Sequence, residues 1–237
     1  MSLKEHPGRR QVVYLLGATG AAHLLGRVPL AGAEPLAAAA APGAACVVRP
    51  AQPQGPFFID ERLERSDIRV DTRDGVLRPG LPLDITFRVT RGGREQCTPL
   101  DKAVVDVWNS DAQGRYSDTG DTRGATFLRG YQVTDGSGLA RFKTIYPGWY
   151  GGRTVHVHFK IRSGPRAKVP FEFTSELYFE ESTSDAVFAQ PPYAGRGVRS
   201  TRNGDDGMFQ HGGRDLVLPV TRSGEGLAGT LDITLQV

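Results

Sequence analysis

The stretch "YPGWYGGRTVHVHFKIR", residues 146–162, contains the pattern that decides the fold. In its second half, apolar and polar side chains alternate and β-branched residues are frequent, which predicts a β-strand. Because alternate side chains of a strand face the same way, His156 and His158 should project side by side. Val155, Val157 and Phe159 should face the opposite way, toward a second layer.

Short runs of this kind recur through most of the chain, separated by the turn sequences "RGG", "DAQG", "TDGSG" and "RSGPR". No amphipathic pattern is long enough to predict a helix of more than a turn or two. The predicted fold class is therefore all-β, an antiparallel β-sandwich of the immunoglobulin or transthyretin-like kind. The predicted strands are residues 83–90, 102–111, 139–146, 154–162, 173–180 and 229–237.

Two connections between these runs are distinctive. The Asp-Gly and Ser-Gly steps of "TDGSG", residues 134–138, predict a hairpin loop between the runs 127–133 and 139–145. Residues 111–130 contain Asp, Gly, Thr and Arg with little apolar periodicity, which predicts a long loop. Because long ordered loops on a rigid scaffold often carry function, we expect active-site residues there.

The composition sets the class of protein. With 237 residues, of which 39% are hydrophobic and 23% charged, the chain has enough apolar material for one sizeable core. The formal charge of +3 comes from charges scattered along the chain, without the block of like charges that marks a nucleic-acid-binding arm. The sequence therefore does not predict nucleic acid as a partner.

The N-terminal part differs in composition from the rest. It runs from the Arg9-Arg10 pair through a mildly apolar stretch into an Ala/Gly/Pro tract, the order of an export signal. The pair resembles a twin-arginine signal, and the apolar stretch is too short and glycine-rich for a stable membrane span. We expect residues 1–45 to be a signal and flexible spacer, residues 46–237 to be the sandwich domain, and the protein to be exported to the periplasm, cell surface or exterior.

The chain contains two cysteines, Cys46 and Cys97. In an oxidising compartment, an even number of cysteines predicts a disulfide, which would stabilise the fold by about 4 kcal/mol in the chain-entropy model. The alternatives are two unpaired thiols or a lipid anchor at Cys46.

A pair of neutral imidazoles on one side of a strand suits a metal ion. Of the five histidines, His6 and His23 lie in the predicted signal, so a three-histidine zinc site would need His211. Nothing near His211 in the sequence fixes such a geometry. A site of two histidines and one carboxylate is also open, although no H-x-D or H-x-E pair supports it.

Tyrosines offer a further pair of ligands. Tyr116 and Tyr150 each occupy a turn sequence, "DAQGRYSD" and "PGWYGGR". Two tyrosinates with two histidines form a hard, anionic set that suits Fe(III), whose charge can deprotonate phenols with an ordinary pKa of about 10.

These residues carry a family resemblance. The segments "AVVDVWNSDAQGRYS" (103–117) and "FLRGYQVTDGSGLARFKTIYPGWYGGRTVHVHFKI" (127–161) resemble the intradiol ring-cleavage dioxygenases, non-haem Fe(III) enzymes that include protocatechuate 3,4-dioxygenase and catechol 1,2-dioxygenase. The resemblance extends from residue 49 to past Phe179. It implies four iron ligands and an arginine beside the substrate. The implied ligands are Tyr116, Tyr150, His156 and His158, and the arginine is Arg153.

The resemblance also implies an activity. A catechol-type aromatic and O2 would be the small-molecule partners, and the ring would open between the two hydroxylated carbons to give a cis,cis-muconate-type diacid. Tyr150 would leave the metal and accept a proton from the substrate. Arg153 would stabilise an anionic intermediate, and the neighbouring Trp149 would line the substrate pocket.

The chain departs from the family pattern in two places. Where the family often has a glutamine in "TQLYF", this chain has "SELYF", which places Glu176 in the substrate pocket or, alternatively, on a solvent-facing strand. The Ala/Gly/Pro tract also cannot supply the helical dimerisation region of catechol 1,2-dioxygenases. The chain thus resembles the exported, single-domain members, and a homo-oligomer is left open.

Two other classes of protein fit parts of the sequence. A non-catalytic transthyretin-like or immunoglobulin-like binding module would have the same fold and bind no iron. A different metalloenzyme would hold zinc or Fe(II) with the two histidines and a carboxylate, and would lack the colour of a tyrosinate bound to Fe(III).

Overall fold

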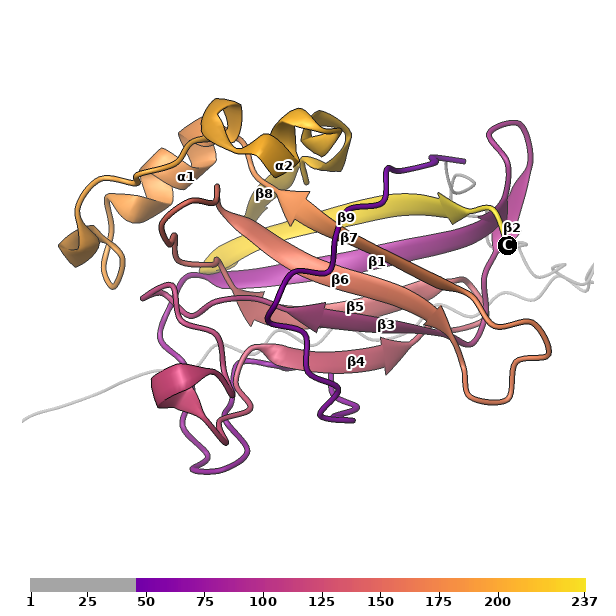
Figure 1. The fold of residues 1–237 in the computed structure, drawn as a ribbon, viewed down its shortest axis with the longest axis horizontal. Coiled ribbons are helices and arrows are strands. Elements are labelled where there is room, and N and C mark those ends of the chain that lie inside the picture. The colour runs from indigo at the N-terminus through magenta and orange to yellow at the C-terminus, as the bar shows by residue number, and fades with distance from the viewer. Residues whose placement is uncertain (1–45) are drawn as a thin grey trace, which may run out of the picture. The chain divides into compact units, whose positions relative to one another are not determined.

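The computed structural model describes residues 46–237 (Figure 1). The predicted signal and spacer at 1–45, the Arg9-Arg10 pair, His6 and His23 lie outside the described residues, so the domain boundary at residue 46 stays a prediction. Within the described range, no helix combines the length and apolar character that a membrane crossing requires.

The first of two β-sheets is built around strand β1, which pairs on both of its sides. Its N-terminal part pairs with β5 and its C-terminal end with β2, both antiparallel, while its other side pairs in parallel with β9. Strand β8 pairs with β9 and ends the sheet. The strands are β1 (Pro82–Gly92), β2 (Cys97–Pro99), β5 (Leu139–Ile145), β8 (Val220–Ser223) and β9 (Gly226–Leu235).

The second sheet is wholly antiparallel, in the order β4-β3-β6-β7. Its strands are β3 (Ala103–Trp108), β4 (Arg129–Val133), β6 (His156–Ser163) and β7 (Glu172–Tyr178). Strand β6 is central, and its register places His158 between Trp108 on β3 and Glu176 on β7. His156 lies opposite Tyr178.

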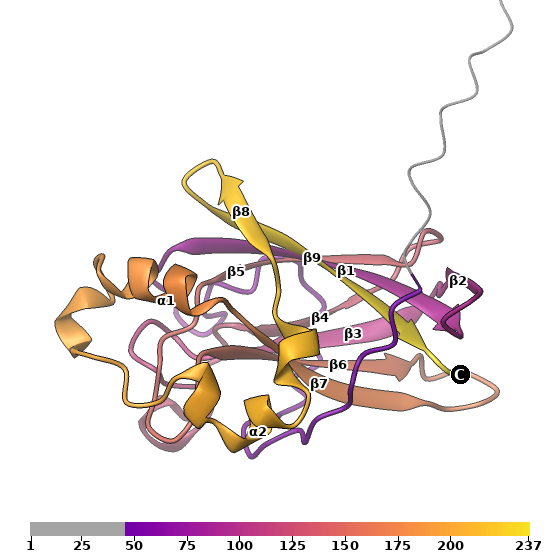
Figure 2. The same ribbon diagram turned by 90° about the horizontal axis from the view of Figure 1, so that it is seen from above.

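The two sheets pack face to face and bury an apolar core between them (Figure 2). Phe87 of β1 meets Phe159 of β6 with ring centroids 5.2 Å apart, and it contacts Phe142 of β5 edge to face. Val157 and Ile161 of β6 lie in the same core. The predicted sandwich is confirmed, with one parallel pair, β1 with β9, that an antiparallel prediction does not include.

All six predicted strands are present, with ends shifted by a few residues. The short strands β2 and β8 escape the sequence analysis because three or four residues are too few to show a period. Helices are short, as expected, and most follow β7. They are α1 (Glu181–Phe188) and α2 (Gly207–Gln210), with 3-10 turns η1 (Gly120–Thr122), η2 (Ala194–Arg196), η3 (Asn203–Asp205) and η4 (Gly213–Leu216).

The predicted hairpin at residues 134–138 is wrong. The strands on either side, β4 and β5, belong to different sheets, because β4 pairs with β3 and β5 pairs with β1. The turn chemistry itself is present: the Asp135 carboxylate accepts hydrogen bonds from the backbone N–H groups of Ser137 and Leu139. A tight Asp-Gly turn therefore reverses the chain here without joining two paired strands.

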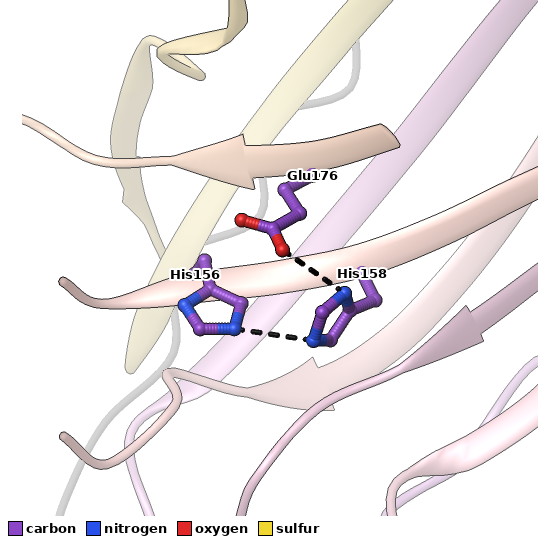
Figure 3. A group of neighbouring side chains, drawn as sticks. All are labelled: His156, His158 and Glu176. Atoms are coloured by element: carbon purple, nitrogen blue, oxygen red, sulfur yellow. Dashed lines mark hydrogen bonds and ion pairs between the residues drawn. The ribbon is translucent and has the colours of Figure 1, made fainter. Parts of the chain in front are cut away.

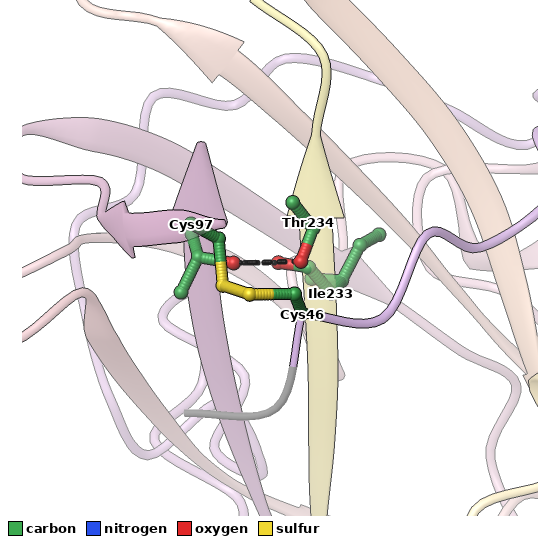
Figure 4. The surroundings of a disulfide bond; sticks show 5 residues. Cys46, Cys97, Ile233 and Thr234 are labelled. Atoms are coloured by element: carbon green, nitrogen blue, oxygen red, sulfur yellow. Dashed lines mark hydrogen bonds between the residues drawn. A yellow bond between two sulfur atoms is a disulfide. The ribbon is translucent and has the colours of Figure 1, made fainter. Parts of the chain in front are cut away.

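A disulfide ties the beginning of the described chain to the first sheet. Cys46 is bonded to Cys97 at the start of β2, beside Ile233 and Thr234 of β9 (Figure 4). From there the chain crosses to the second sheet, where the backbone N–H of Gln52 donates to the carbonyl of Thr174 on β7. This crossing segment, residues 46–58, continues to the site described next.

Candidate metal centre

Strand β6 holds the two histidines in fixed positions. His156 and His158 are 2% and 1% exposed. The indole of Trp108 stacks on the imidazole of His158, with 5.0 Å between centroids and 4° between planes. Gly55, at a φ of +70°, lies so near that a Cβ atom there would be 3.3 Å from Cε1 of His158. The His158 ring is thus held in one plane.

The two tyrosines reach the histidines from separate loops. Tyr116 lies in the loop after β3, where it is buried and stacks on Phe57 of the crossing segment at 4.3 Å. Tyr150 precedes β6 in a tight turn that ends at Arg153, and Gly152 supplies the positive φ of +84° that this turn needs. Both phenols point toward His156.

The four donor atoms form one compact group. The Nε2 atom of His156 lies 3.3 Å from Oη of Tyr116, 3.0 Å from Oη of Tyr150 and 3.1 Å from Nε2 of His158. Two ligands about 2.1 Å from one ion, at a right angle, lie about 3.0 Å from each other. The spacing of the four donors therefore fits a single metal ion.

In each imidazole, the contact of Nδ1 shows that Nε2 is the nitrogen that faces the other donors. Nδ1–H of His156 donates to the carbonyl of Thr154 at 2.6 Å, so Nε2 presents its lone pair. Nδ1 of His158 points the other way, toward Oε1 of Glu176 at 3.4 Å (Figure 3). Among the described His, Cys, Asp and Glu side chains, His156, His158 and Glu176 form the one cluster that could hold a metal ion. Glu176 nevertheless faces Nδ1 of His158, whereas the Nε2 atom of that ring faces His156.

Burial sets the protonation of the donors. It lowers the pKa of His156 and, together with the nearby His156 and Arg153, that of His158, so both imidazoles are uncharged at neutral pH. Burial raises the pKa of Tyr150 to about 12 and that of Tyr116 well above its ordinary value. A highly charged ion is needed to replace these phenolic protons, which favours a trivalent metal over Zn²⁺ or Fe²⁺.

A buried charged group lies beside the donors. The Arg153 guanidinium contacts both oxygens of Glu176, with Nη1 3.1 Å from Oε1, and its Nε donates to Asp206 at 2.9 Å. The carboxylate side chains are 0% and 1% exposed, against 20% for the arginine. Burial alone would lower the pKa of Arg153, but the hydrogen bond and charge of Glu176 raise it instead. Glu176 is thus not a solvent-facing strand residue.

Three residues of this group have no counterpart in the sequence prediction. Oη of Tyr178 lies 2.6 Å from Oε2 of Glu176 and 2.7 Å from the side-chain oxygen of Gln52. Asp206 accepts from the backbone N–H of Thr154 at 2.8 Å and caps helix α2. Tyr178 shares a strand face with Glu176, so alternation could have indicated it. Gln52 and Asp206 come from distant segments with no chemical motif.

Two further residues that the sequence suggested, His211 and Trp149, make their contacts outside the group of four donors. His211, directly after α2, is exposed, and its Nδ1–H donates to the carbonyl of Gly207, the first residue of that helix. Trp149 packs against the core and under the guanidinium of Arg196, whose carbon is 4.5 Å from the ring centroid. The structure therefore brings Tyr116, Tyr150, His156 and His158 together, with Arg153 and Glu176 adjacent.

Comparison with known proteins points to one enzyme class. A family model described as "Dioxygenase" matches residues 54–195. A chlorocatechol 1,2-dioxygenase from Pseudomonas putida is 31% identical over 148 residues, which are 54% of this chain and 52% of that protein. The chain thus spans about half the length of this curated relative.

Solved structures cover more of the chain. An intradiol ring-cleavage dioxygenase from Tetranychus urticae has 30% identity and a TM-score of 0.67, over 81% of this chain and 95% of that one. The dioxygenase domain of a carbohydrate-binding fusion protein from Streptomyces sp. SirexAA-E has 29% identity and a TM-score of 0.59, over 81% and 99%. The segment that the family model matches, residues 54–195, contains all four donor residues.

Proposed function

The chain belongs to the intradiol ring-cleavage dioxygenase family, and from this premise we propose that it is itself a non-haem Fe(III) enzyme that cleaves a catechol-type aromatic with O2. One observation carries the proposal: two phenol oxygens and one imidazole nitrogen lie within 3.0 to 3.3 Å of a second imidazole nitrogen, Nε2 of His156. The ring would open between the two hydroxylated carbons, and both oxygen atoms would enter a cis,cis-muconate-type diacid.

Four residues would hold the metal, namely Tyr116, Tyr150, His156 and His158. When bound, Fe(III) supplies the Lewis acidity that favours a doubly deprotonated, chelating catechol and opens it to reaction with O2. The donor set supports this choice of metal because two phenolates and two neutral imidazoles are hard ligands that match a trivalent ion.

Tyr150 would hold and move the substrate proton. Its side chain is half-buried and lies on a glycine turn, whereas Tyr116 is 3% exposed and stacked on Phe57. Tyr150 is therefore the phenol with room to swing away and accept a proton at Oη from the incoming catechol. Tyr116 would stay in place.

The positive charge of Arg153 would stabilise negative charge on the substrate. Its guanidinium is fixed by Glu176 and Asp206 on one side and is 20% exposed. A fixed cation in a partly dry site stabilises an anionic aromatic ring more than the same cation in water would.

We also propose that the protein is exported. Disulfides persist in oxidising compartments, so the bond between Cys46 and Cys97 supports this location. Detection of the protein in a periplasmic or culture-supernatant fraction would test it, and retention in the cytoplasm would contradict it.

The activity is tested by a visible absorption spectrum with an iron assay, before and after anaerobic addition of catechol, followed by admission of O2. We expect about one iron per chain, a burgundy tyrosinate-to-iron band that shifts with catechol, and O2 uptake with a ring-opened diacid. A protein that stays colourless and iron-free after reconstitution with Fe(III) would overturn the proposal.

A further inference from the structure

A buried carboxylate lies directly behind one of the proposed iron ligands. Glu176 is fully buried on β7, opposite His158 in the strand register. Its Oε1 is 3.4 Å from Nδ1 of His158 (Figure 3). Within the described chain, this Nδ1 atom is buried and forms no hydrogen bond, because the approach of Oε1 is longer than an ordinary N–H···O bond and poorly aligned. A buried polar atom without a hydrogen bond costs free energy, so the buried carboxylate that faces this nitrogen is a candidate acceptor for its proton.

The position of Glu176 is fixed from the other sides. Arg153 contacts both carboxylate oxygens, and Oη of Tyr178 lies 2.6 Å from Oε2. These contacts compensate the cost of burying the charge. They also aim the remaining side of Oε1 at His158.

The packing around His158 leaves one choice open. Trp108 stacks on the ring at 4° between planes, and Gly55 approaches its Cε1 edge closely. Stacking fixes the plane of an imidazole but is nearly indifferent to a 180° flip about the Cβ–Cγ bond, which exchanges Nδ1 with Cδ2 and Nε2 with Cε1. A charged acceptor on one side decides which nitrogen carries the proton and faces it.

We infer that Glu176 is a positioning residue of the metal centre, which accepts a hydrogen bond from Nδ1–H of His158 once the ion holds that ring, keeps Nε2 directed at the phenols, and strengthens that imidazole as a donor to Fe(III). The inference rests on the proposed ferric site. Carboxylates behind metal-bound histidines fix the tautomer and raise the basicity of the ligand. His156 differs, because the group behind it is the uncharged carbonyl of Thr154.

The test is Glu176→Gln, which keeps the shape and an acceptor oxygen but removes the charge. We expect the affinity for Fe(III) to fall by about 10- to 100-fold. The visible band should move to longer wavelength, because a more electron-poor iron accepts charge from tyrosinate at lower energy. The reduction potential should rise by about 59 mV for each tenfold by which ferric binding weakens more than ferrous binding.

Glu172→Gln is the matched control. It makes the same chemical change on the same strand, where the side chain is 57% exposed and paired with Lys160 at 2.9 Å. This variant should keep the parent's iron affinity, band and potential. If Glu176→Gln also keeps all three, Glu176 does not position His158 and the inference is overturned.

A measurement on the parent protein removes the dependence on how well the variant folds. With diamagnetic Ga(III) in the site, the nitrogen NMR spectrum of the imidazoles should show a proton on Nδ1 of His158 at low field and slow to exchange. An unprotonated Nδ1, or a proton that exchanges as freely as one in water, would overturn the inference.

The two proposals fail in distinguishable ways. A parent protein that binds Fe(III) with the burgundy band but opens no catechol ring overturns the proposed activity, and the comparison of Glu176→Gln with Glu172→Gln is still decisive for the positioning role. An active parent whose Glu176→Gln variant is spectroscopically identical overturns the positioning role alone.

Discussion

Strand β6 has two faces that do different work. The inner face places Val157, Phe159 and Ile161, each 0% exposed, against the other sheet. The outer face begins with His156 and His158, which meet directional partners at specific atoms. Apolar packing tolerates many arrangements of similar volume, whereas a metal site requires particular atoms at particular distances. Alternation along one short strand thus places the core residues on one face and the histidines of the candidate site on the other.

The outer face is itself divided along its length. Beyond the histidines, Lys160 pairs with Glu172 at 2.9 Å, and Arg162 pairs with Asp106 at 2.7 Å. These ion pairs lie at the end of the strand away from the tyrosine loops. The chemistry is therefore confined to the end of the outer face that the loops and the crossing segment cover.

The largest effect is expected at the outer face, from His158→Ala. Removing this ligand should abolish iron binding while leaving the sandwich folded, since the core is on the opposite face. The measurement is iron per chain after reconstitution, with circular dichroism to check the fold. The exposed His211→Ala is the control and should keep its iron. A His158→Ala variant with the parent's iron content would contradict the assignment.

Tyr150→Phe should keep most of the metal binding but lose most of the turnover. Tyr150 is the half-buried donor, and the three buried donors stay in place, so most of the iron should be retained. The proton acceptor is lost, however, and turnover should fall by about 10²- to 10⁴-fold. Iron content and catechol-dependent O2 uptake measure the two quantities. Tyr131→Phe, whose hydroxyl is 3.4 Å from Glu64 on another part of the sheet, is the matched control. Parent-like turnover in Tyr150→Phe would rule out its role as acceptor.

Phe159→Ala changes the inner face of the same strand. The cavity should lower the free energy of unfolding by about 3–5 kcal/mol. Denaturant unfolding measures this loss. Iron per folded chain should not change, because the side chain faces away from the donors. Should this variant stay folded yet lose its iron, the separation of the two faces would be false.

The smallest effect is expected from Glu172→Gln at the far end of the outer face. The carboxylate is 57% exposed, so solvent and salt screen its pair with Lys160. The free energy of unfolding should change by less than about 1 kcal/mol. Thermal or denaturant unfolding at low and high salt measures it, and a loss of several kcal/mol would show that the outer face also carries stability.

The sequence predicts much of this division. The period of two in residues 154–162 places the histidines and the core residues on opposite faces, as found. It cannot show that Glu176 is buried, because the cover over that face comes from Gln52 and Asp206, far away in the chain. Alternation assigns a side chain to a face, and distant segments decide whether that face meets water.

Other features depended on long-range pairing. The turn at 134–138 has the local chemistry of a hairpin, but strands β4 and β5 find partners in different sheets. Tyr116 and Tyr150 lie on separate loops, and no spacing rule brings their hydroxyls to His156. Their meeting was predicted through the family resemblance, and the distances of 3.3 and 3.0 Å agree with it.

The parallel pairing of β1 with β9 has a consequence for biosynthesis. Thr90 and Thr234, hydrogen-bonded across this pair, are 144 positions apart, so the first sheet cannot close until β9 has left the ribosome. The strands of the second sheet lie within residues 103–178 and are made together. We therefore expect the sheet that carries His156 and His158 to assemble early, with its apolar inner face exposed until β9 is made. During that interval the nascent protein would depend on chaperones for protection from aggregation.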